Sequence, residues 1–178
     1  AFREGFGKSI LAQKLARRHM KRVGVKWNWV DSTIYYAWDD FLKKYMADSP
    51  VWTFLILDEA WQALFSRLSM AAAQREVVQA FGTGRYKKHN VIICGPNMMW
   101  FDNIIRGHSA QYWLHIARKW EDTAEVRIMK RCQTTIYPTH HVQWDCLSHR
   151  IYDLDVPRTF IDAYNAAKKL AHDAFLLE

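Results

Sequence analysis

A short glycine-rich segment near the start of the chain holds residue types that suit phosphate binding. Gly5, Gly7, Lys8 and Ser9 stand directly before an amphipathic stretch. Glycines let the backbone turn its N–H groups toward phosphate oxygens, and a helix that begins there adds the positive end of its dipole. Lys8 would reach the β and γ phosphates, and Ser9 would offer its hydroxyl to Mg²⁺. The predicted nucleotide-binding residues are Gly5, Phe6, Gly7, Lys8, Ser9 and Ile10.

A second motif places two carboxylates after an apolar run. Residues 54–57 are Phe-Leu-Ile-Leu, and Asp58 and Glu59 follow them. At the carboxyl end of a parallel strand, Asp58 would hold Mg²⁺ through water, and Glu59 would orient and deprotonate an attacking water. Capping of the next helix by Asp58 is the competing interpretation. The two motifs occur in the order of the Walker A and Walker B motifs of P-loop nucleotide hydrolases, so they predict binding and hydrolysis of Mg·ATP.

The first motif departs from the full P-loop pattern in two ways. The consensus G-x-x-x-x-G-K-[ST] requires glycine where this chain has Phe2, and no strand precedes the loop. We therefore expect the first strand of the domain to be missing from this sequence. An accidental likeness of Gly-Lys-Ser to a P-loop is the alternative.

Hydrophobic periodicity predicts the elements that position these residues. Five helices are expected, over residues 9–22, 39–47, 60–80, 98–106 and 158–177. Strands are expected over 23–29, 51–57, 91–94 and 111–116, with a two-stranded ribbon of 124–131 and 142–152. Strands that alternate with helices predict a three-layer α/β/α domain with a mostly parallel sheet, extended by the ribbon and a final helix. We expect residues 1–178 to form this single domain.

Composition limits the possible settings and partners. Half of the residues are hydrophobic and 24% are charged, which excludes a disordered chain. Lysine and arginine exceed the acidic residues by 25 − 18 = 7, so the chain is attracted to polyanions. Three cysteines provide no disulfide framework, and no apolar run is long enough to span a membrane. With no signal peptide at the start, we expect a cytoplasmic protein.

Taken together, these segments resemble the HerA/FtsK branch of P-loop ATPases, especially small viral genome-packaging ATPases and Zot-like proteins. The likeness rests on GFGKS, LILDEAWQALFSR, FGTGRYKKHNVIICGP, MMWFDNIIRGHSAQYW and YDLDVPRTFIDAYN. The resemblance implies a polar sensor after the strand that follows Walker B, where Asn97 is the nearby amide. It also implies an arginine from a neighbouring subunit, for which Arg85 is preferred over Arg67 and Arg106.

The resemblance further implies a homo-oligomeric ring, often a hexamer, that translocates double-stranded DNA without reading its sequence. In a virus, the ring would work in the host cytoplasm with a capsid or portal component. The basic clusters at 14–22 and 85–89 are candidate DNA contacts. Two alternatives stay open: a Zot-like ATPase of phage assembly or secretion, and a nucleotide-binding assembly module that does not hydrolyse ATP.

A zinc site in the ribbon is a weaker hypothesis. Its candidate ligands are Cys132, His140, His141, Cys146 and His149. Only the pair Cys146-x-x-His149 has zinc-like spacing, and no second pair accompanies it. Cys132 also fits a buried position in a strand.

Overall fold

The computed structural model describes residues 6–24, 34–47, 54–58, 79–81, 89–98, 101, 105–133 and 142–175, and structural statements below concern these residues. Its helices are α1 (Phe6–Arg22), α2 (Trp38–Met46), α5 (Arg158–Phe175) and a π-helical turn, η3 (Ile105–Ser109). Its strands are β1 (Ile34–Tyr35), β2 (Phe54–Leu57), β3 (Asn90–Ile93), β4 (Tyr112–Lys119), β5 (Thr123–Gln133) and β6 (Val142–Asp153).

The predicted parallel sheet is present, with strand order β1-β2-β3. Ile34, Ile56 and Ile92 lie side by side across the three strands, which are parallel throughout. The central strand β2 is apolar along its whole length, and its last three residues are buried. A continuous apolar strand is typical of a parallel sheet that is covered on both faces.

Helices cover both faces of this sheet. Ala12 and Ala16 of α1 pack against Ile56 on one face, where the small side chains allow a close approach. Phe41 of α2 packs with Leu55 on the other face. Because successive strand residues point to opposite faces, the single apolar run of β2 supplies both of these contacts.

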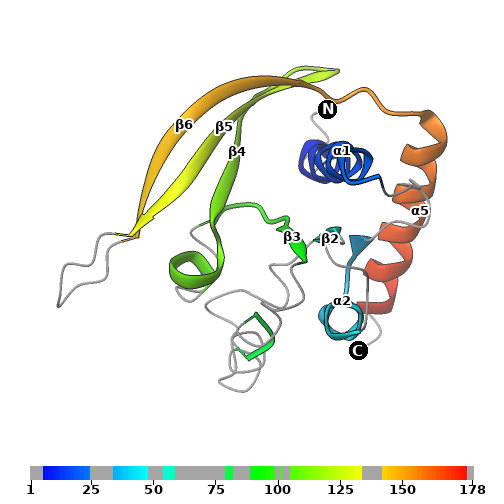
Figure 1. The fold of residues 1–178 in the computed structure, drawn as a ribbon. Helices are drawn as coiled ribbons and strands as arrows, with labels where there is room; N and C mark the ends of the chain where they lie inside the picture. Colours follow the sequence, from blue (N-terminus) through cyan, green and yellow to red (C-terminus); the bar gives the residue numbers. More distant parts are fainter. Residues whose placement is uncertain are drawn as a thin grey trace.

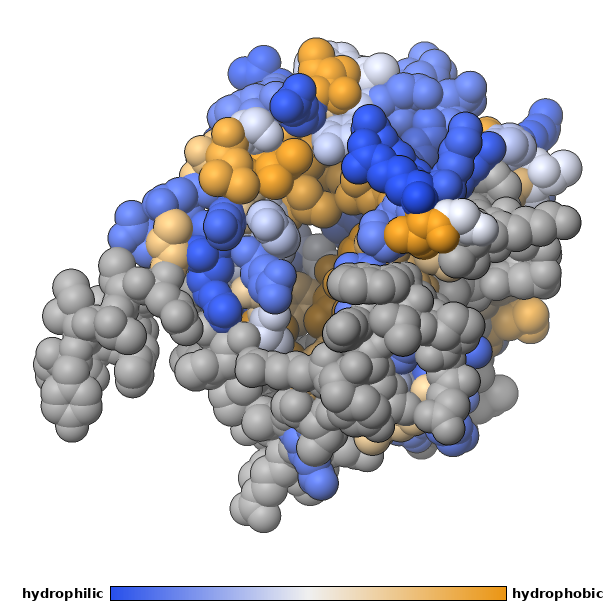
Figure 2. All heavy atoms as spheres, in the orientation of Figure 1, coloured by the Kyte–Doolittle hydropathy of each residue, from blue (hydrophilic) through white to orange (hydrophobic). Residues whose placement is uncertain are grey.

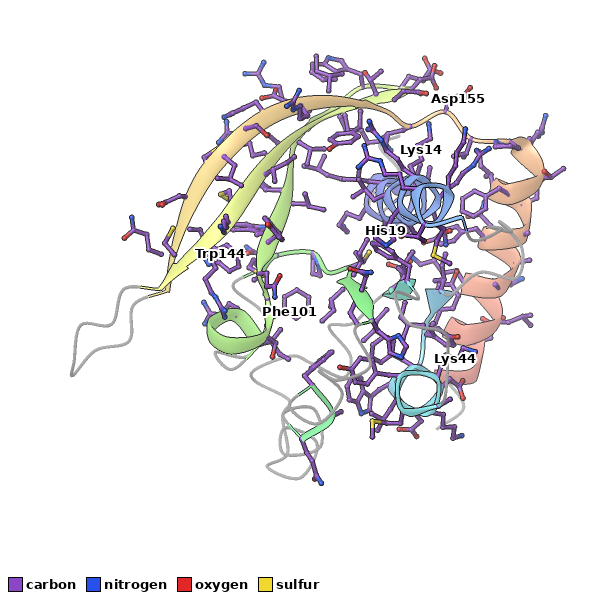
Figure 3. All side chains as sticks on the ribbon, viewed as in Figure 1. Lys14, His19, Lys44, Phe101, Trp144 and Asp155 are labelled. Carbon is purple, nitrogen blue, oxygen red and sulfur yellow. The ribbon has the colours of Figure 1, made fainter. Side chains whose placement is uncertain are left out.

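Helix α1 runs antiparallel to β2. Its second turn begins beside the carboxyl end of β2, where Ser9 contacts Asp58. Near its other end, the His19 ring packs edge-on against Phe54, the first residue of β2, with ring centroids 5.2 Å apart, and His19 lies on the sheet side of α1 (Figure 3). His19 Nε2 also lies 3.4 Å from the side-chain nitrogen of Asn90, the first residue of β3. This direction puts the start of α1 at the carboxyl edge of the sheet.

Strands β4, β5 and β6 form a separate antiparallel sheet in that order, which arcs away from α1 (Figure 1). Ala124 and Val126 of β5 are buried on one face and belong to a cluster with Ile10 of α1 and Phe160 of α5. On the other face the register aligns the exposed residues His115, Arg127 and His149. This alternation is typical of an antiparallel sheet with one solvated face.

Several sequence predictions are confirmed to within a few residues. The helices at 9–22, 39–47 and 158–177 correspond to α1, α2 and α5, and the ribbon corresponds to β5 and β6. The strands at 51–57 and 91–94 correspond to β2 and β3, although residues 51–53 lie outside the described part. Of the expected helix at 60–80, only its last residues are described, and they are helical.

Other predictions need correction. Val23 and Gly24, expected in a strand, form the turn that ends α1: Val23 N–H donates to His19 O, and Gly24 has φ 74°. The rest of 23–29 lies outside the described residues. The helix expected at 98–106 is wrong at Phe101, which is an isolated β-bridge residue, and a π-helical turn begins at Ile105.

The strand expected at 111–116 is longer and belongs to the ribbon. It is β4, and its partner is β5, with His115 opposite Arg127. The short connection of residues 120–122 allows β4 and β5 to form a hairpin, which favours antiparallel pairing over a place in the parallel sheet. The predicted two-stranded ribbon is thus a three-stranded sheet.

Candidate nucleotide and magnesium site

Two residues from the predicted motifs meet at the carboxyl edge of the parallel sheet. Ser9 Oγ donates a hydrogen bond of 2.7 Å to Asp58 Oδ2. Both residues are buried, with exposed fractions of 1% and 3%. Asp58 follows directly after β2, and its backbone N–H donates to Tyr35 O of β1, so the sheet itself fixes its position. The antiparallel direction of α1 then brings Ser9 to the carboxylate.

A third side chain completes this cluster. The Tyr164 hydroxyl, from α5, lies 2.6 Å from Asp58 Oδ2 and 3.0 Å from Ser9 Oγ. Burial, followed by the negative charge of Asp58, raises the pKa of Tyr164 well above its usual range. The phenol therefore stays protonated and donates its hydrogen to the carboxylate. Sequence reasoning missed Tyr164: it lies 106 positions from Asp58, and although the segment YDLDVPRTFIDAYN contains it, nothing in that segment assigns it to the site.

Lys8 and Gly7 lie at the start of α1, beside this cluster. Lys8 is half-buried and forms no ion pair with the described residues. A Cβ added to Gly7 would make ordinary contacts of 3.5 to 3.6 Å with Leu154, Lys119 and Ile116. Packing with these residues does not require glycine at position 7. The Lys119 contact also brings a second lysine stem close to the helix start.

The structure separates the remaining predicted residues. The Ile10 side chain lies in the hydrophobic cluster under the antiparallel sheet, so only its backbone remains a candidate for phosphate contact. Asn97 is exposed and follows β3 at the same sheet edge as Asp58, but it has no hydrogen bond to Ser9 or Asp58. Arg106 is half-buried in the π-helical turn. Outside the described residues lie Gly5, Glu59, Arg67, Arg85 and the side chain of Phe6.

The donor atoms of the cluster fit magnesium. Mg²⁺ prefers hard oxygen ligands, and in nucleotide sites it is held by one or two protein oxygens together with phosphates and water. Ser9 and Asp58 supply a hydroxyl and a carboxylate of this kind. The described residues contain no group of three or more His, Cys, Asp or Glu side chains that could hold a metal without such phosphates.

The zinc hypothesis is not supported by the described residues. Cys132 Sγ donates to Asp145 Oδ2 at 2.7 Å, and that hydrogen bond is the main reason why the Cys132 pKa is raised. His149 Nδ1 instead lies 3.4 Å from Glu125 Oε1. These side chains thus have separate partners, and no metal-binding group forms among the described residues. His140 and His141 lie outside them.

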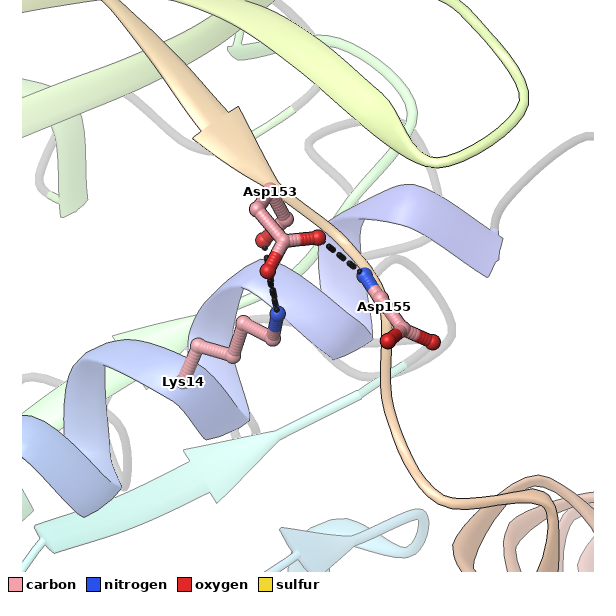
Figure 4. Close-up of polar contacts among 3 residues, drawn as sticks. All are labelled: Lys14, Asp153 and Asp155. Carbon is pink, nitrogen blue, oxygen red and sulfur yellow. Dashed lines mark hydrogen bonds and ion pairs between the residues drawn. The ribbon is translucent and has the colours of Figure 1, made fainter.

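The basic cluster at 14–22 divides into two parts. Lys14 Nζ binds Asp153 twice, at 2.9 Å to the carbonyl oxygen and 3.1 Å to Oδ2, and so joins α1 to the end of β6 (Figure 4). Arg18, Lys21 and Arg22 are exposed near the end of α1. Lys14 is therefore a structural contact, and the exposed residues are the better candidates for binding a polyanion.

Comparison of the chain with protein-family models, curated proteins and solved structures finds no match. Among the described helices, none combines the length and apolar character needed to cross a bilayer. The case for a function therefore rests on the geometry of the site.

Proposed function

We propose that this chain is a Mg²⁺-dependent ATPase of the P-loop class with a three-layer α/β/α core. The observation that carries the proposal is the buried hydrogen bond between Ser9 and Asp58, which unites residues 49 positions apart. The same two residues are the ones that the Walker A and Walker B motifs assign to Mg²⁺. Helices on both faces of the parallel sheet support the layered core.

Each residue has a defined part in the proposed reaction. Backbone N–H groups of residues 5–10 surround the phosphates, and Lys8 neutralises charge on the β and γ phosphates. Ser9 and Asp58 hold Mg²⁺, which supplies charge neutralisation when bound. Glu59 accepts a proton from the attacking water, whose oxygen forms the new bond to the γ phosphorus as the bond to ADP breaks. Asn97 and a neighbouring subunit's arginine, Arg85 first among the candidates, are further proposed contacts with the γ phosphate.

We propose further that ATP hydrolysis moves double-stranded DNA through a homo-oligomeric ring, as in viral genome packaging. The net charge of +7 supports a polyanionic partner. The exposed Arg18, Lys21 and Arg22 offer phosphate contacts that carry no sequence information. Hydrophilic side chains also predominate over the upper part of the surface in Figure 2, with hydrophobic ones between them.

The test is ATP turnover by the full-length protein with and without duplex DNA. Lys8→Ala and Glu59→Gln are expected to lower turnover by roughly 100-fold or more, with nucleotide binding retained in Glu59→Gln. Lys44→Ala and Glu121→Gln change the same residue types at exposed positions of α2 and of the β4–β5 turn, and serve as matched controls. If Glu59→Gln is as fast as the parent, Glu59 is not the base.

The same assay separates the alternatives. Stimulation by duplex DNA that declines as salt is raised supports a DNA motor. Turnover without such stimulation supports a Zot-like assembly ATPase. Nucleotide binding without turnover supports an assembly module. Absence of Mg²⁺-dependent nucleotide binding overturns the proposal as a whole.

A further inference from the structure

The Tyr164 hydroxyl lies at distances that match those of a ligand in a magnesium coordination sphere. Mg²⁺ binds oxygen at about 2.1 Å in an octahedron, so two adjacent ligand oxygens lie about 3.0 Å apart. The Tyr164 hydroxyl is 3.0 Å from Ser9 Oγ, the proposed direct ligand. It is also 2.6 Å from Asp58 Oδ2, the proposed acceptor of a hydrogen bond from Mg²⁺-bound water. One hydroxyl therefore meets both distance requirements of such a water.

We propose that Tyr164 is a latch: its hydroxyl takes the place of a magnesium-bound water on Ser9 and Asp58, and Mg·nucleotide must displace it to bind. This inference rests on the proposed function, because it requires Ser9 and Asp58 to be the magnesium site. It adds that the site is closed by a residue from the C-terminal helix.

The latch works by substitution of one neutral donor for another. A Mg²⁺-bound water and a protonated phenol both donate a hydrogen to a carboxylate. With 5% of its surface exposed, Tyr164 thus satisfies the buried Asp58 carboxylate in the absence of metal, when that group would otherwise be a costly buried charge. Once Mg²⁺ and its waters provide these hydrogens, the phenol is redundant and sterically in the way.

Displacement of the hydroxyl must affect α5, because the ring is enclosed. The Tyr164 ring lies 6.2 Å from the Tyr36 ring and 6.0 Å from the Phe160 ring, and Lys168 Nζ lies 5.9 Å from its centroid. A packed aromatic ring has no free rotamer to adopt without a shift of its neighbours. In Figure 1, α5 passes beside α1, which is seen nearly end-on, and beside the edge of the parallel sheet.

The same contacts indicate which part of the molecule a shift of α5 would reach. Phe160, one turn before Tyr164, belongs to the cluster that contains Ala124 and Val126 of β5. A shift of α5 would therefore reach the base of the antiparallel sheet. Nucleotide binding at the edge of the parallel sheet would in this way affect the packing of the antiparallel sheet.

The decisive variant is Tyr164→Phe, which removes the hydroxyl and keeps the ring. Mg²⁺ is titrated into full-length protein at a fixed concentration of a fluorescent ADP analogue. Because the variant has no latch bonds to break, its Mg²⁺ midpoint is expected to fall by roughly 10-fold to 100-fold, the range typical of a hydrogen bond to a charged group. The nucleotide-free variant is expected to unfold at a lower temperature than the parent.

Tyr152→Phe is the matched control, because Tyr152 packs against the same cluster without bonding Ser9 or Asp58. Its Mg²⁺ midpoint should equal that of the parent. A merely structural role for Tyr164 predicts lower stability with an equal or higher Mg²⁺ midpoint, and that result overturns the latch alone. If neither the parent nor Tyr164→Phe binds nucleotide in a Mg²⁺-dependent way, the proposed function is overturned as well.

Hydrogen exchange on the parent tests the latch without any substitution. Addition of Mg·ADP is expected to raise amide exchange in residues 158–175, while exchange in α2, residues 38–46, stays unchanged. Unchanged or slower exchange in α5 with bound Mg·ADP contradicts displacement. This measurement also decides the matter if Tyr164→Phe fails to fold.

Discussion

The parallel sheet and the antiparallel sheet differ in how they accommodate polar side chains. At the parallel sheet, Ser9, Asp58 and Tyr164 are buried and bond one another at 2.6 to 3.0 Å. On the antiparallel sheet, Arg118 Nε lies 3.8 Å from Glu125 Oε2, and the arginine side chain is 76% exposed. Water can replace a partner at the second site and cannot at the first. Substitutions at the buried site are therefore expected to have larger effects than substitutions at the exposed pair.

Topology explains this difference. The carboxyl ends of parallel strands lie at one edge, and there the start of α1 and the side of α5 enclose Asp58. Antiparallel strands instead alternate an apolar face with a solvated one, so Arg127 and His149 face water. Chemistry is therefore expected at the edge of the parallel sheet. The outer face of the antiparallel sheet is expected to tolerate substitution.

The largest expected effect contrasts a carboxylate from each sheet. Asp58→Asn removes the charge that orients magnesium-bound water, and we expect ATP turnover to fall by roughly 100-fold. Glu125→Gln, on the antiparallel sheet, should leave turnover within about twofold of the parent. Steady-state assays on both variants, with circular dichroism to verify folding, make the comparison. Equal losses of ATP turnover in the two variants would show that the two sheets do not differ in this respect.

The second prediction concerns Gly95, which follows Cys94 after β3. A Cβ at Gly95 would clash with Cζ of Phe101 (labelled in Figure 3), a buried ring in the cluster on the α2 face of the sheet. Gly95→Ala forces that ring to move and is expected to reduce the free energy of unfolding by about 1 to 3 kcal/mol. Urea denaturation measures this change in the free energy of unfolding. An unchanged midpoint would mean that Phe101 is not held in place.

The third prediction uses Gly7 as the counterpart of Gly95. Ordinary contacts surround a Cβ at position 7, so Gly7→Ala should leave the free energy of unfolding within about 0.5 kcal/mol or raise it slightly, since alanine favours a helix. Nucleotide affinity should fall roughly tenfold, because the methyl group obstructs the approach of phosphate to the backbone. Isothermal titration with Mg·ADP provides the measurement. Full affinity would argue against a phosphate site at the start of α1.

The smallest expected effect concerns the contact between the two regions. The backbone N–H of Asp155, and then Lys14, lower the pKa of the Asp153 carboxyl. A lowered folded-state pKa gives stability that is present above the unfolded value of about 3.9 and is lost as pH falls through the folded-state pKa. Asp153→Asn should therefore flatten the acid limb of the stability curve below about pH 4: the variant is slightly less stable than the parent near neutrality, and the difference disappears in acid.

Thermal unfolding at a series of pH values measures this effect. Glu121→Gln, at an exposed position in the β4–β5 turn, is the control. An acid limb as steep in Asp153→Asn as in the control would show that Asp153 contributes nothing to pH-dependent stability.

Local patterns predicted much of the fold. The apolar run before Asp58 and the spacing of Ile10, Ala12 and Ala16 are properties of consecutive residues, and they correctly predicted β2 and α1. The order of the motifs also predicted that Ser9 and Asp58 would meet. Val23 and Gly24 were wrongly expected in a strand, because the positive φ of Gly24 ends α1 with a turn there. The alternating apolar residues of 23–29 could not reveal that turn.

The sequence by itself determined the parallel sheet, its covering helices and the residue types at its carboxyl edge, because each depends on side chains close together along the chain. Tertiary structure alone decided that β4 joins the ribbon, that Lys14 binds Asp153, and that Tyr164 bonds Asp58. The Lys14–Asp153 and Tyr164–Asp58 contacts join residues far apart in sequence, and all three depend on how whole elements pack. No local periodicity specifies such pairs, since a lysine or tyrosine on a helix has the same neighbours in sequence whichever partner the fold brings to it.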